Sequence, residues 1–220
     1  MTPALQASTL YRFFRVGDEE TLALQSVSLT VEPGEFVTVA GPSGSGKSTL
    51  LSCLAGIDEP DGGAVHVTGR RMSHRPEAVR ARLRADELGL LFQSRNLLQH
   101  LTVAENLALI QRVRGRSRAA SVGALLESLG IEGKADRLPR DLSGGESARA
   151  GLAVALVNEP AALLADEPTG ELDGSAERDV LLALRARAAA GTAILVASHS
   201  PAVTEASDRV IRLSDGRIVG

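Results

Sequence analysis

Cysteine is nearly absent from this chain of 220 residues, which contains Cys53 alone. A single cysteine excludes an internal disulfide and a metal site built from several thiolates, and it agrees with a reducing compartment. Aromatic residues make up only 2%, and tryptophan is missing altogether. Proteins that bind single-stranded nucleic acid stack bases on aromatic side chains, so this scarcity disfavours that class.

The chain also lacks a strong net charge and a long hydrophobic run. Its 24 basic and 27 acidic residues leave a net charge of -3, so no nucleic-acid partner is expected. Basic clusters at 70–84 and 112–118 are interpreted as solvated helix faces, because acidic residues balance them. No segment approaches the ~20 apolar residues of a membrane span, and no signal-peptide pattern opens the chain. We therefore expect a soluble, unexported protein.

Strand patterns alternate with helical patterns along most of the chain, which predicts an α/β fold with a mostly parallel core sheet and antiparallel trim at both ends. Strand signals vanish between about 94 and 158. We therefore expect one domain, 1–220, with a core at 1–93 and 159–220 and an inserted helical subdomain at about 94–158. The predicted strands are 23–31, 36–40, 64–69, 88–92, 161–165, 192–198 and a hairpin at 210–219. The predicted helices are 48–57, 76–86, 103–113, 118–129, 146–157, 175–189 and a short one after Pro201.

A phosphate-binding loop is predicted between a strand and a helix, where glycine-rich backbone can wrap a phosphate chain with its N–H groups. Lys47, one of two lysines beside 22 arginines, would reach the β and γ phosphates, and Ser48 would offer a hydroxyl to Mg²⁺. A mere glycine-rich turn is the weaker alternative. The loop fits G-x-x-x-x-G-K-[ST] and, with the next residue, comprises Gly41, Pro42, Ser43, Gly44, Ser45, Gly46, Lys47, Ser48 and Thr49.

Two acids, Asp166 and Glu167, follow the apolar strand at 161–165. Ligands bind at the carboxyl ends of parallel strands, so Asp166 can hold the Mg²⁺ shell and Glu167 can accept the proton of an attacking water. Adjacent acids after a strand often cap a helix instead. The phosphate loop in the same chain favours the catalytic interpretation.

Two further patterns point to phosphate. Ser143, Gly144, Gly145 and Glu146 open a predicted helix with Ser143 as N-cap, and such a helix start is a second possible phosphate site. Because the chain has one phosphate loop, we expect this second helix start to bind a nucleotide that another subunit holds. His199 ends the strand at 192–198, where a position beside the phosphate site favours a catalytic over a structural histidine.

The order of these motifs resembles ATP-binding-cassette (ABC) ATPases over nearly the whole chain: the phosphate loop, Gln93 after LGLLF, LSGGE, LLADEPTGELD and ASHS. LLFQSRNLLQHLTVAENLAL and DEPTGELD look most like the lipoprotein-releasing, macrolide-efflux and cell-division branch. The resemblance implies a P-loop ABC ATPase fold. It also implies that LSGGE at 142–146 is the signature motif of the family. Two chains would form a head-to-tail dimer that sandwiches two ATP molecules, each between one chain's phosphate loop and the other chain's signature motif.

The same resemblance implies roles for single residues. Phe14 falls where the family stacks an aromatic on adenine, although Tyr11 and Phe13 are close competitors. Gln93 would contact Mg²⁺ and the membrane partner, Asp173 would be the acid of the D-loop, and His199 would contact the γ-phosphate. Glu167, His199 and Gln93 are thus the expected catalytic residues, and Ser48, Gln93 and Asp166 the expected metal ligands.

Three departures from the family pattern bear on the turnover rate. Ser147-Ala148-Arg149 stands where the family usually writes Gln-Gln-Arg. Val154 replaces an arginine, and Ser200 follows His199 where aspartate is common.

We therefore expect an ATP-binding and hydrolysing subunit that powers a separate membrane permease of efflux or lipoprotein-release type, located in the cytoplasm at the inner face of the cell membrane. The alternative is an ATPase that signals to a membrane partner and activates an extracytoplasmic enzyme without transport. A cassette acting on ribosomes or DNA is disfavoured, because 220 residues hold neither a second cassette nor a long coiled coil. A catalytically dead module is disfavoured because Lys47, Asp166, Glu167 and His199 are all present.

Overall fold

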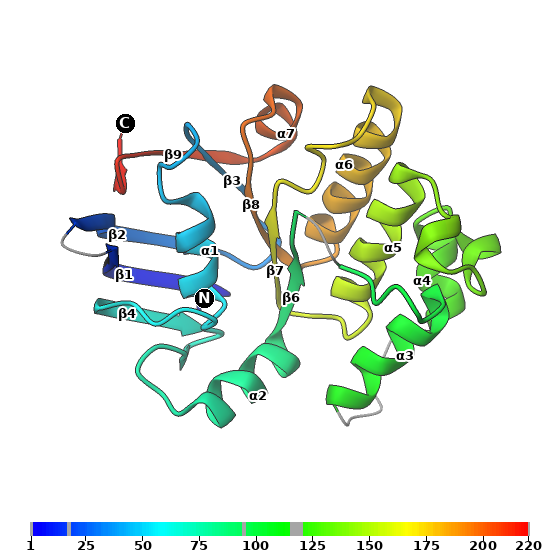
Figure 1. Ribbon diagram of the computed structural model, residues 1–220, viewed down its shortest axis with the longest axis horizontal. Coiled ribbons are helices and arrows are strands. Elements are labelled where there is room, and N and C mark those ends of the chain that lie inside the picture. The colour runs from blue at the N-terminus through cyan, green and yellow to red at the C-terminus, as the bar shows by residue number, and fades with distance from the viewer. Residues whose placement is uncertain (1, 17–18, 94–95, 115–120, 220) are drawn as a thin grey trace.

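A computed structural model describes residues 2–16, 19–93, 96–114 and 121–219. Figure 1 shows a central sheet with a smaller antiparallel sheet on one side and a group of helices on the other. Among the described residues, no helix is both long and apolar enough to span a membrane.

The central sheet has six strands in the order β10-β9-β3-β8-β7-β6. All neighbours pair in parallel except β10, which returns antiparallel along β9. The predicted parallel core and C-terminal hairpin are thereby confirmed. The strands are β3 (Phe36–Ala40), β6 (Leu88–Leu91), β7 (Ala162–Asp166), β8 (Ala193–Ala197), β9 (Arg209–Ser214) and β10 (Arg217–Ile218).

The smaller sheet has four antiparallel strands in the order β2-β1-β4-β5. They are β1 (Leu5–Val16), β2 (Glu19–Val31), β4 (Gly62–Val67) and β5 (Arg70–Arg71). The sequence patterns do not predict β1 or β5. The β1–β2 register shifts near Thr9, which has a positive φ of 47°, and again on both sides of Arg12. These irregularities break the alternation by which a strand is recognised.

The helices match the predicted order with small shifts at their ends. The predicted helix 118–129 and the basic cluster 112–118 lie partly outside the described residues, and the signature helix starts at Gly144 rather than 146. The α-helices are α1 (Lys47–Leu54), α2 (Glu77–Glu87), α3 (Val103–Arg114), α4 (Val122–Ser128), α5 (Gly144–Leu156), α6 (Gly174–Ala189) and α7 (Pro201–Ala206). Two short 3-10 helices are η1 (Glu132–Lys134) and η2 (Pro139–Asp141).

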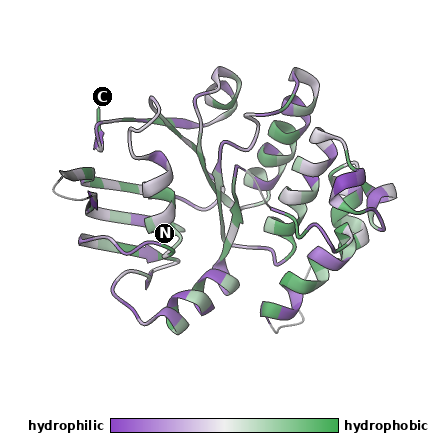
Figure 2. Cartoon of the chain, viewed as in Figure 1, coloured by the Kyte–Doolittle hydropathy of each residue, from purple (hydrophilic) through white to green (hydrophobic). Residues whose placement is uncertain are grey.

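Side chains of the central sheet alternate between two hydrophobic cores. On β8, Ala193, Leu195 and Ala197 pack with the antiparallel sheet and α1, whereas Ile194 and Val196 pack with α3, α4, α5 and α6. The central strands are correspondingly hydrophobic along their length (Figure 2), as expected for a parallel sheet covered on both faces. The division into a core and an inserted helical subdomain at about 94–158 stays a prediction.

Candidate active site

The carboxyl ends of β3, β7 and β8 open on a cleft of about 830 Å³. Of the predicted site residues, the cleft is lined by Phe14, Gly41, Pro42, Ser43, Gly44, Gly46, Lys47, Ser48, Thr49, Gln93, Asp166, Glu167 and His199. The fold therefore brings the phosphate loop, both acids and the histidine to one place, although they come from distant parts of the sequence. Ser143, Gly145, Glu146 and Asp173 are not among its described lining residues, and Gly144 lines a neighbouring cavity.

The phosphate loop depends on glycine at the point where it enters α1. Gly46 is the N-cap of α1 and has a φ of 103°, a conformation that L side chains rarely adopt. A Cβ there would lie 2.4 Å from the carbonyl oxygen of Ala23. No side chain caps α1, so the first N–H groups of the helix stay available to an anion.

The Lys47 ammonium lies over its own loop. Its Nζ donates hydrogen bonds to the carbonyl oxygens of Gly41 at 2.8 Å and Pro42 at 3.0 Å. The loop carbonyls thus hold the cation at the cleft, beside the uncapped helix start. A phosphate that entered here would meet the ammonium and the helix N–H groups together.

Glu167 is held by two side chains from the end of β8. Ser198 Oγ donates to Glu167 Oε2 at 2.9 Å, and His199 Nδ1 lies 2.8 Å from Glu167 Oε1. Only 12% of the Glu167 side chain is exposed, against 75% for His199. A histidine whose Nδ1 faces a carboxylate turns its Nε2 to a ligand. The pair can therefore take up a proton at Glu167 and contact an anion at His199.

The helix-cap alternative for the two adjacent acids is not what the structure shows, because the cap of α6 is Asp173. Its Oδ1 accepts hydrogen bonds from the N–H groups of Ser175 at 3.0 Å and Ala176 at 2.9 Å. The Ala176 N–H, and then the Ser175 hydroxyl and N–H, lower the pKa of Asp173 below its ordinary value. Asp173 is thus a helix cap in the single chain, and its predicted D-loop role stays a prediction.

Glu177 on α6 joins the loops that follow β7 and β8, and sequence reasoning missed it. Its Oε1 accepts hydrogen bonds from Thr169 Oγ1 at 2.9 Å and from Ser200 Oγ at 2.8 Å. Ser200, one of the departures from the family pattern, therefore has a defined partner. The signal in the sequence was weak, because Glu177 lies on an ordinary exposed helix pattern far from Ser200.

The signature segment starts α5 with a closed cap. Ser143 Oγ accepts from Glu146 N at 3.3 Å, and Glu146 Oε2 accepts from Ser143 N at 2.9 Å, so the predicted N-cap is confirmed. Lys134 Nζ lies 2.9 Å from Glu146 Oε1. The Ser143 N–H and then Lys134 lower the pKa of Glu146 below its ordinary value. Both lysines of the chain thus lie at predicted nucleotide-binding segments.

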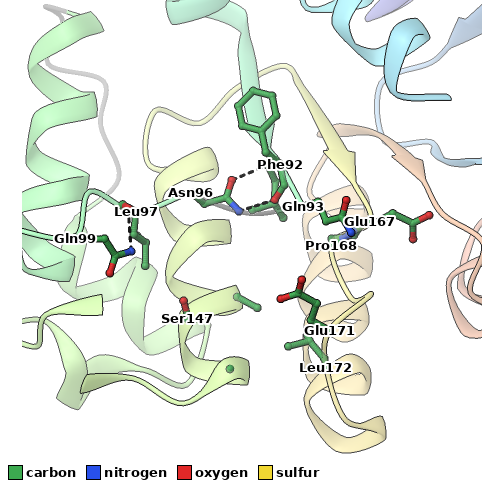
Figure 3. Close-up of a pocket in the computed structure, with 13 residues that line it drawn as sticks. Phe92, Gln93, Asn96, Leu97, Gln99, Ser147, Glu167, Pro168, Glu171 and Leu172 are labelled. Carbon is green, nitrogen blue, oxygen red and sulfur yellow. Dashed lines mark hydrogen bonds between the residues drawn. The ribbon is translucent and has the colours of Figure 1, made fainter. Parts of the chain in front are cut away.

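A second cavity of about 250 Å³ lies between the start of α5, residues 92–93 and 96–99, and the loop at 167–172 (Figure 3). Gln93 and Glu167 line this cavity as well as the larger cleft. Asn96 closes the loop that carries Gln93, since it accepts from Phe92 N at 2.8 Å and donates to Phe92 O at 2.6 Å. Gln93 is therefore placed between the candidate active site and the helices that follow β6.

Of the three neighbouring aromatic residues on β1, Phe14 is the one that lines the cleft among the described residues. The residue is 37% exposed. Tyr11 instead lies against Gly62 of β4. The geometry therefore favours Phe14 over Tyr11 and Phe13 as a platform for a planar group in the cleft.

A phosphate loop facing paired acids across a parallel sheet defines a nucleoside-triphosphate-binding fold. Comparison with known proteins is more specific: residues 24–170 match the ABC transporter family. The chain belongs to this family.

Relatives of high similarity cover nearly the whole chain. An uncharacterized ABC transporter ATP-binding protein of Mycobacterium tuberculosis is 42% identical over 99% of this chain and 89% of its own length. The macrolide export ATP-binding/permease protein MacB of Burkholderia pseudomallei is 40% identical over 99% of this chain, which spans 34% of that protein. The dimeric structure of the bacterial ABC transporter cassette MJ0796 superimposes with a TM-score of 0.90 at 31% identity, covering 98% of this chain and 97% of the other.

These findings confirm the predicted family, the ABC ATPase fold and the class of ATP-binding and ATP-hydrolysing cassettes. The roles of single residues stay predictions.

Proposed function

We propose that this chain powers a membrane permease of efflux or lipoprotein-release type through an ATP-driven dimer of two copies. The observation that carries the proposal is the single cleft in which the phosphate loop faces Asp166, Glu167 and His199. Its similarity to MacB, whose name joins an ATP-binding part to a permease, supports a permease partner. The partner would hold the chain at the cytoplasmic face of the cell membrane.

Mg²⁺ fits this cleft as a companion of the nucleotide. Among the described residues, no group of three or more His, Cys, Asp or Glu could hold a metal ion. Mg²⁺ bound to phosphates needs only one or two protein ligands, and it prefers oxygen. Ser48, Asp166 and Gln93 line the cleft and offer hydroxyl, carboxylate and amide oxygens. These three residues would hold the ion, which would neutralise charge on the β and γ phosphates.

The residues of the cleft divide the work of hydrolysis. Lys47 and the uncapped N–H groups of α1 bind the phosphates and orient them. Glu167, fixed by Ser198, takes the proton of the water that attacks the γ-phosphate. His199 contacts the γ-phosphate from the neighbouring strand end. Because His199 is in contact with Glu167, a change in the contact between His199 and the γ-phosphate also affects Glu167.

The signature segment acts on the nucleotide of the second copy. Ser143, Gly145 and Glu146 do not line the cleft of their own chain among the described residues. MJ0796, which shares this fold, forms a dimer. In a head-to-tail dimer, the start of α5 faces the γ-phosphate held by the partner. Each composite site then needs a phosphate loop from one chain and a signature segment from the other.

Glu167→Gln tests the proposal at its centre. The variant keeps the size of the side chain but accepts a proton poorly, so phosphate release should fall at least ~100-fold while ATP binding persists. ATP should then hold a stable dimer in size-exclusion chromatography. Glu159→Gln, at the opposite end of β7, is the matched control and should hydrolyse ATP normally. Wild-type turnover by Glu167→Gln would remove Glu167 from its role, and a wild-type chain without ATPase activity would overturn the proposed function.

A further inference from the structure

Arg12 lies directly against the aromatic platform of the cleft. Arg12 Cζ is 4.7 Å from the centroid of the Phe14 ring, within the range of a cation–π interaction. Phe14 lines the cleft, whereas Arg12 is not among the described lining residues. The guanidinium covers one face of the ring, which leaves the other face for a ligand in the cleft.

Two carboxylates fix the Arg12 guanidinium. Asp58 accepts hydrogen bonds from Nε at 3.0 Å and from Nη2 at 2.7 Å, and Asp61 accepts from Nη1 at 3.1 Å. This fork geometry leaves little freedom to a side chain of which only 20% is exposed. The plane that supports Phe14 is thus held before any ligand arrives.

Asp61 also ties the backbone beside the platform to the same group. The N–H of Phe13 donates to Asp61 Oδ2 at 2.8 Å. This bond, and more weakly Arg12, lowers the pKa of Asp61 below its ordinary value, so the carboxylate persists at neutral pH. Arg12 and the strand that carries Phe14 therefore share one anchor.

The anchor connects the platform to the phosphate loop. Asp58 and Asp61 follow the C-terminal end of α1, and α1 begins at Lys47 of the phosphate loop. The clamp formed by Arg12, Asp58 and Asp61 thus sets the position of the Phe14 ring relative to the helix that receives phosphate. A nucleotide bridges these two points, with its base at one and its phosphates at the other.

We propose that Arg12 is a positioning and specificity residue for the base of the bound nucleotide. It holds Phe14 in place for stacking, and its positive charge draws electron density from the ring, which favours an electron-rich purine on the opposite face. The proposal rests on the proposed function, because it requires ATP in the cleft. It assigns part of the binding free energy of the base to a residue that does not touch the nucleotide.

The absence of tryptophan gives a clean experiment. In a Phe14→Trp background the indole at position 14 is the only one in the chain, and a base stacked on it should quench its fluorescence. Binding of ATP is measured both by this quenching and by calorimetry, and binding of inorganic triphosphate, which has no base, is measured by calorimetry. Both titrations contain Mg²⁺ and are repeated with Arg12→Met added.

Arg12→Met should weaken ATP binding roughly three- to ten-fold through loss of the cation–π contact and of the clamp. Binding of inorganic triphosphate should stay unchanged, because the phosphate loop is intact. Arg12→Lys, which keeps the charge but not the fork, should fall between the two. Arg70→Met on β5 is the matched control, since Arg70 pairs with Glu87 and does not line the cleft among the described residues.

The outcomes separate the possible errors. Equal losses for ATP and inorganic triphosphate would show that Arg12 supports only the fold, and equal affinities in both chains would show that it has no role in binding. Tight ATP binding without quenching would remove Phe14 as the platform and Arg12 with it. If the parent chain binds neither ligand, the proposed function itself fails. Should Arg12→Met not fold, Asp58→Asn weakens the clamp while keeping the charge of Arg12, and a selective loss of ATP affinity is again expected.

Discussion

Two helix starts were predicted to bind phosphate, and the structure prepares them differently. The start of α1 has Gly46 as N-cap and no side-chain cap, and Lys47 lies over the loop beside it. The start of α5 is closed by the reciprocal hydrogen bonds of Ser143 and Glu146, and it carries the Glu146 carboxylate. One helix start is open and cationic, whereas the other is capped and acidic.

This difference indicates the order in which the two helix starts meet phosphate. A free nucleotide finds uncapped N–H groups and the Lys47 ammonium at α1. At the start of α5, the Glu146 carboxylate closes the cap, and the Lys134 ammonium is already paired with that carboxylate. The α5 start is therefore a poor site for a free anion. It gains a ligand only when a second chain presents phosphates that are already bound. ATP binding should precede dimer formation, and the following variants test this order.

Replacing each lysine in turn compares the two helix starts, and the largest loss of ATP binding is expected at Lys47. Lys47→Ala removes a charge-assisted contact with phosphate, so ATP should bind to the single chain about 100-fold more weakly, a loss of about 3 kcal/mol. Lys47→Arg should also fail, because a planar fork does not fit a loop shaped around a compact ammonium. Lys134→Ala is the matched control and should leave ATP binding by the single chain unchanged, as measured by equilibrium dialysis. Equal losses at both lysines would mean that the two helix starts do not differ in kind.

Gly144→Asp separates dimer formation from nucleotide binding. A Cβ at Gly144 has no neighbour within 4 Å, whereas one at Gly145 would lie 2.8 Å from Ala176 Cβ, so Gly144 can be changed without disturbing its own chain. The new carboxylate should abolish ATP-driven dimers and hydrolysis while ATP still binds to the single chain. Gly123→Asp in the first turn of α4 is the control.

Mixing Gly144→Asp with Lys47→Ala chains sharpens this result. A mixed dimer can rebuild one composite site, from an intact phosphate loop on one chain and an intact signature segment on the other. Some phosphate release should return if one site suffices, and none if both must act together. Normal hydrolysis by Gly144→Asp alone would reduce the signature segment to a structural helix start.

Glu146→Gln should have a smaller, opposite effect. It removes a negative charge that would face the partner's nucleotide in the proposed dimer, so the ATP concentration needed for dimers should fall about two- to five-fold. The pKa of Glu146 in the folded chain is below its ordinary value, so the residue stays ionised as the pH falls past that value. The difference between the variant and the wild type should therefore persist from pH 8 to about pH 5. A difference that vanishes at mildly acidic pH would contradict this assignment.

The smallest expected effect concerns the interior of α1. Burial raises the pKa of the Cys53 thiol to about 12, so the native chain should resist alkylation at pH 8. ATP should not change this, because Cys53 is buried near the C-terminal end of α1, away from the first turn that receives phosphate. Mass spectrometry after iodoacetamide treatment would detect the modification, and reactivity induced by ATP would show that α1 moves.

Much of the site could be predicted because its motifs are local. The phosphate loop at 41–48 and the acids Asp166 and Glu167 occupy strand ends that hydrophobic patterns place correctly. The strand β1 could not be predicted, because three shifts of register break its alternation. The partners of Arg12 and Ser200 escaped prediction for another reason. Hydrogen bonds between residues 46 and 23 positions apart leave no periodic trace in the sequence.

The backbone conformation of Glu167 affects how the sequence of such a chain can evolve. Its φ of 46° places a side-chain-bearing residue in the left-handed region, which costs a fold about 1–2 kcal/mol. Glycine or asparagine would occupy this position with less strain. Selection for folding alone would therefore favour replacement of the glutamate, so its presence agrees with the proposed role of Glu167 in turnover. A descendant that ceased to hydrolyse ATP would be expected to drift to glycine or asparagine here, and to gain heat stability as it did so.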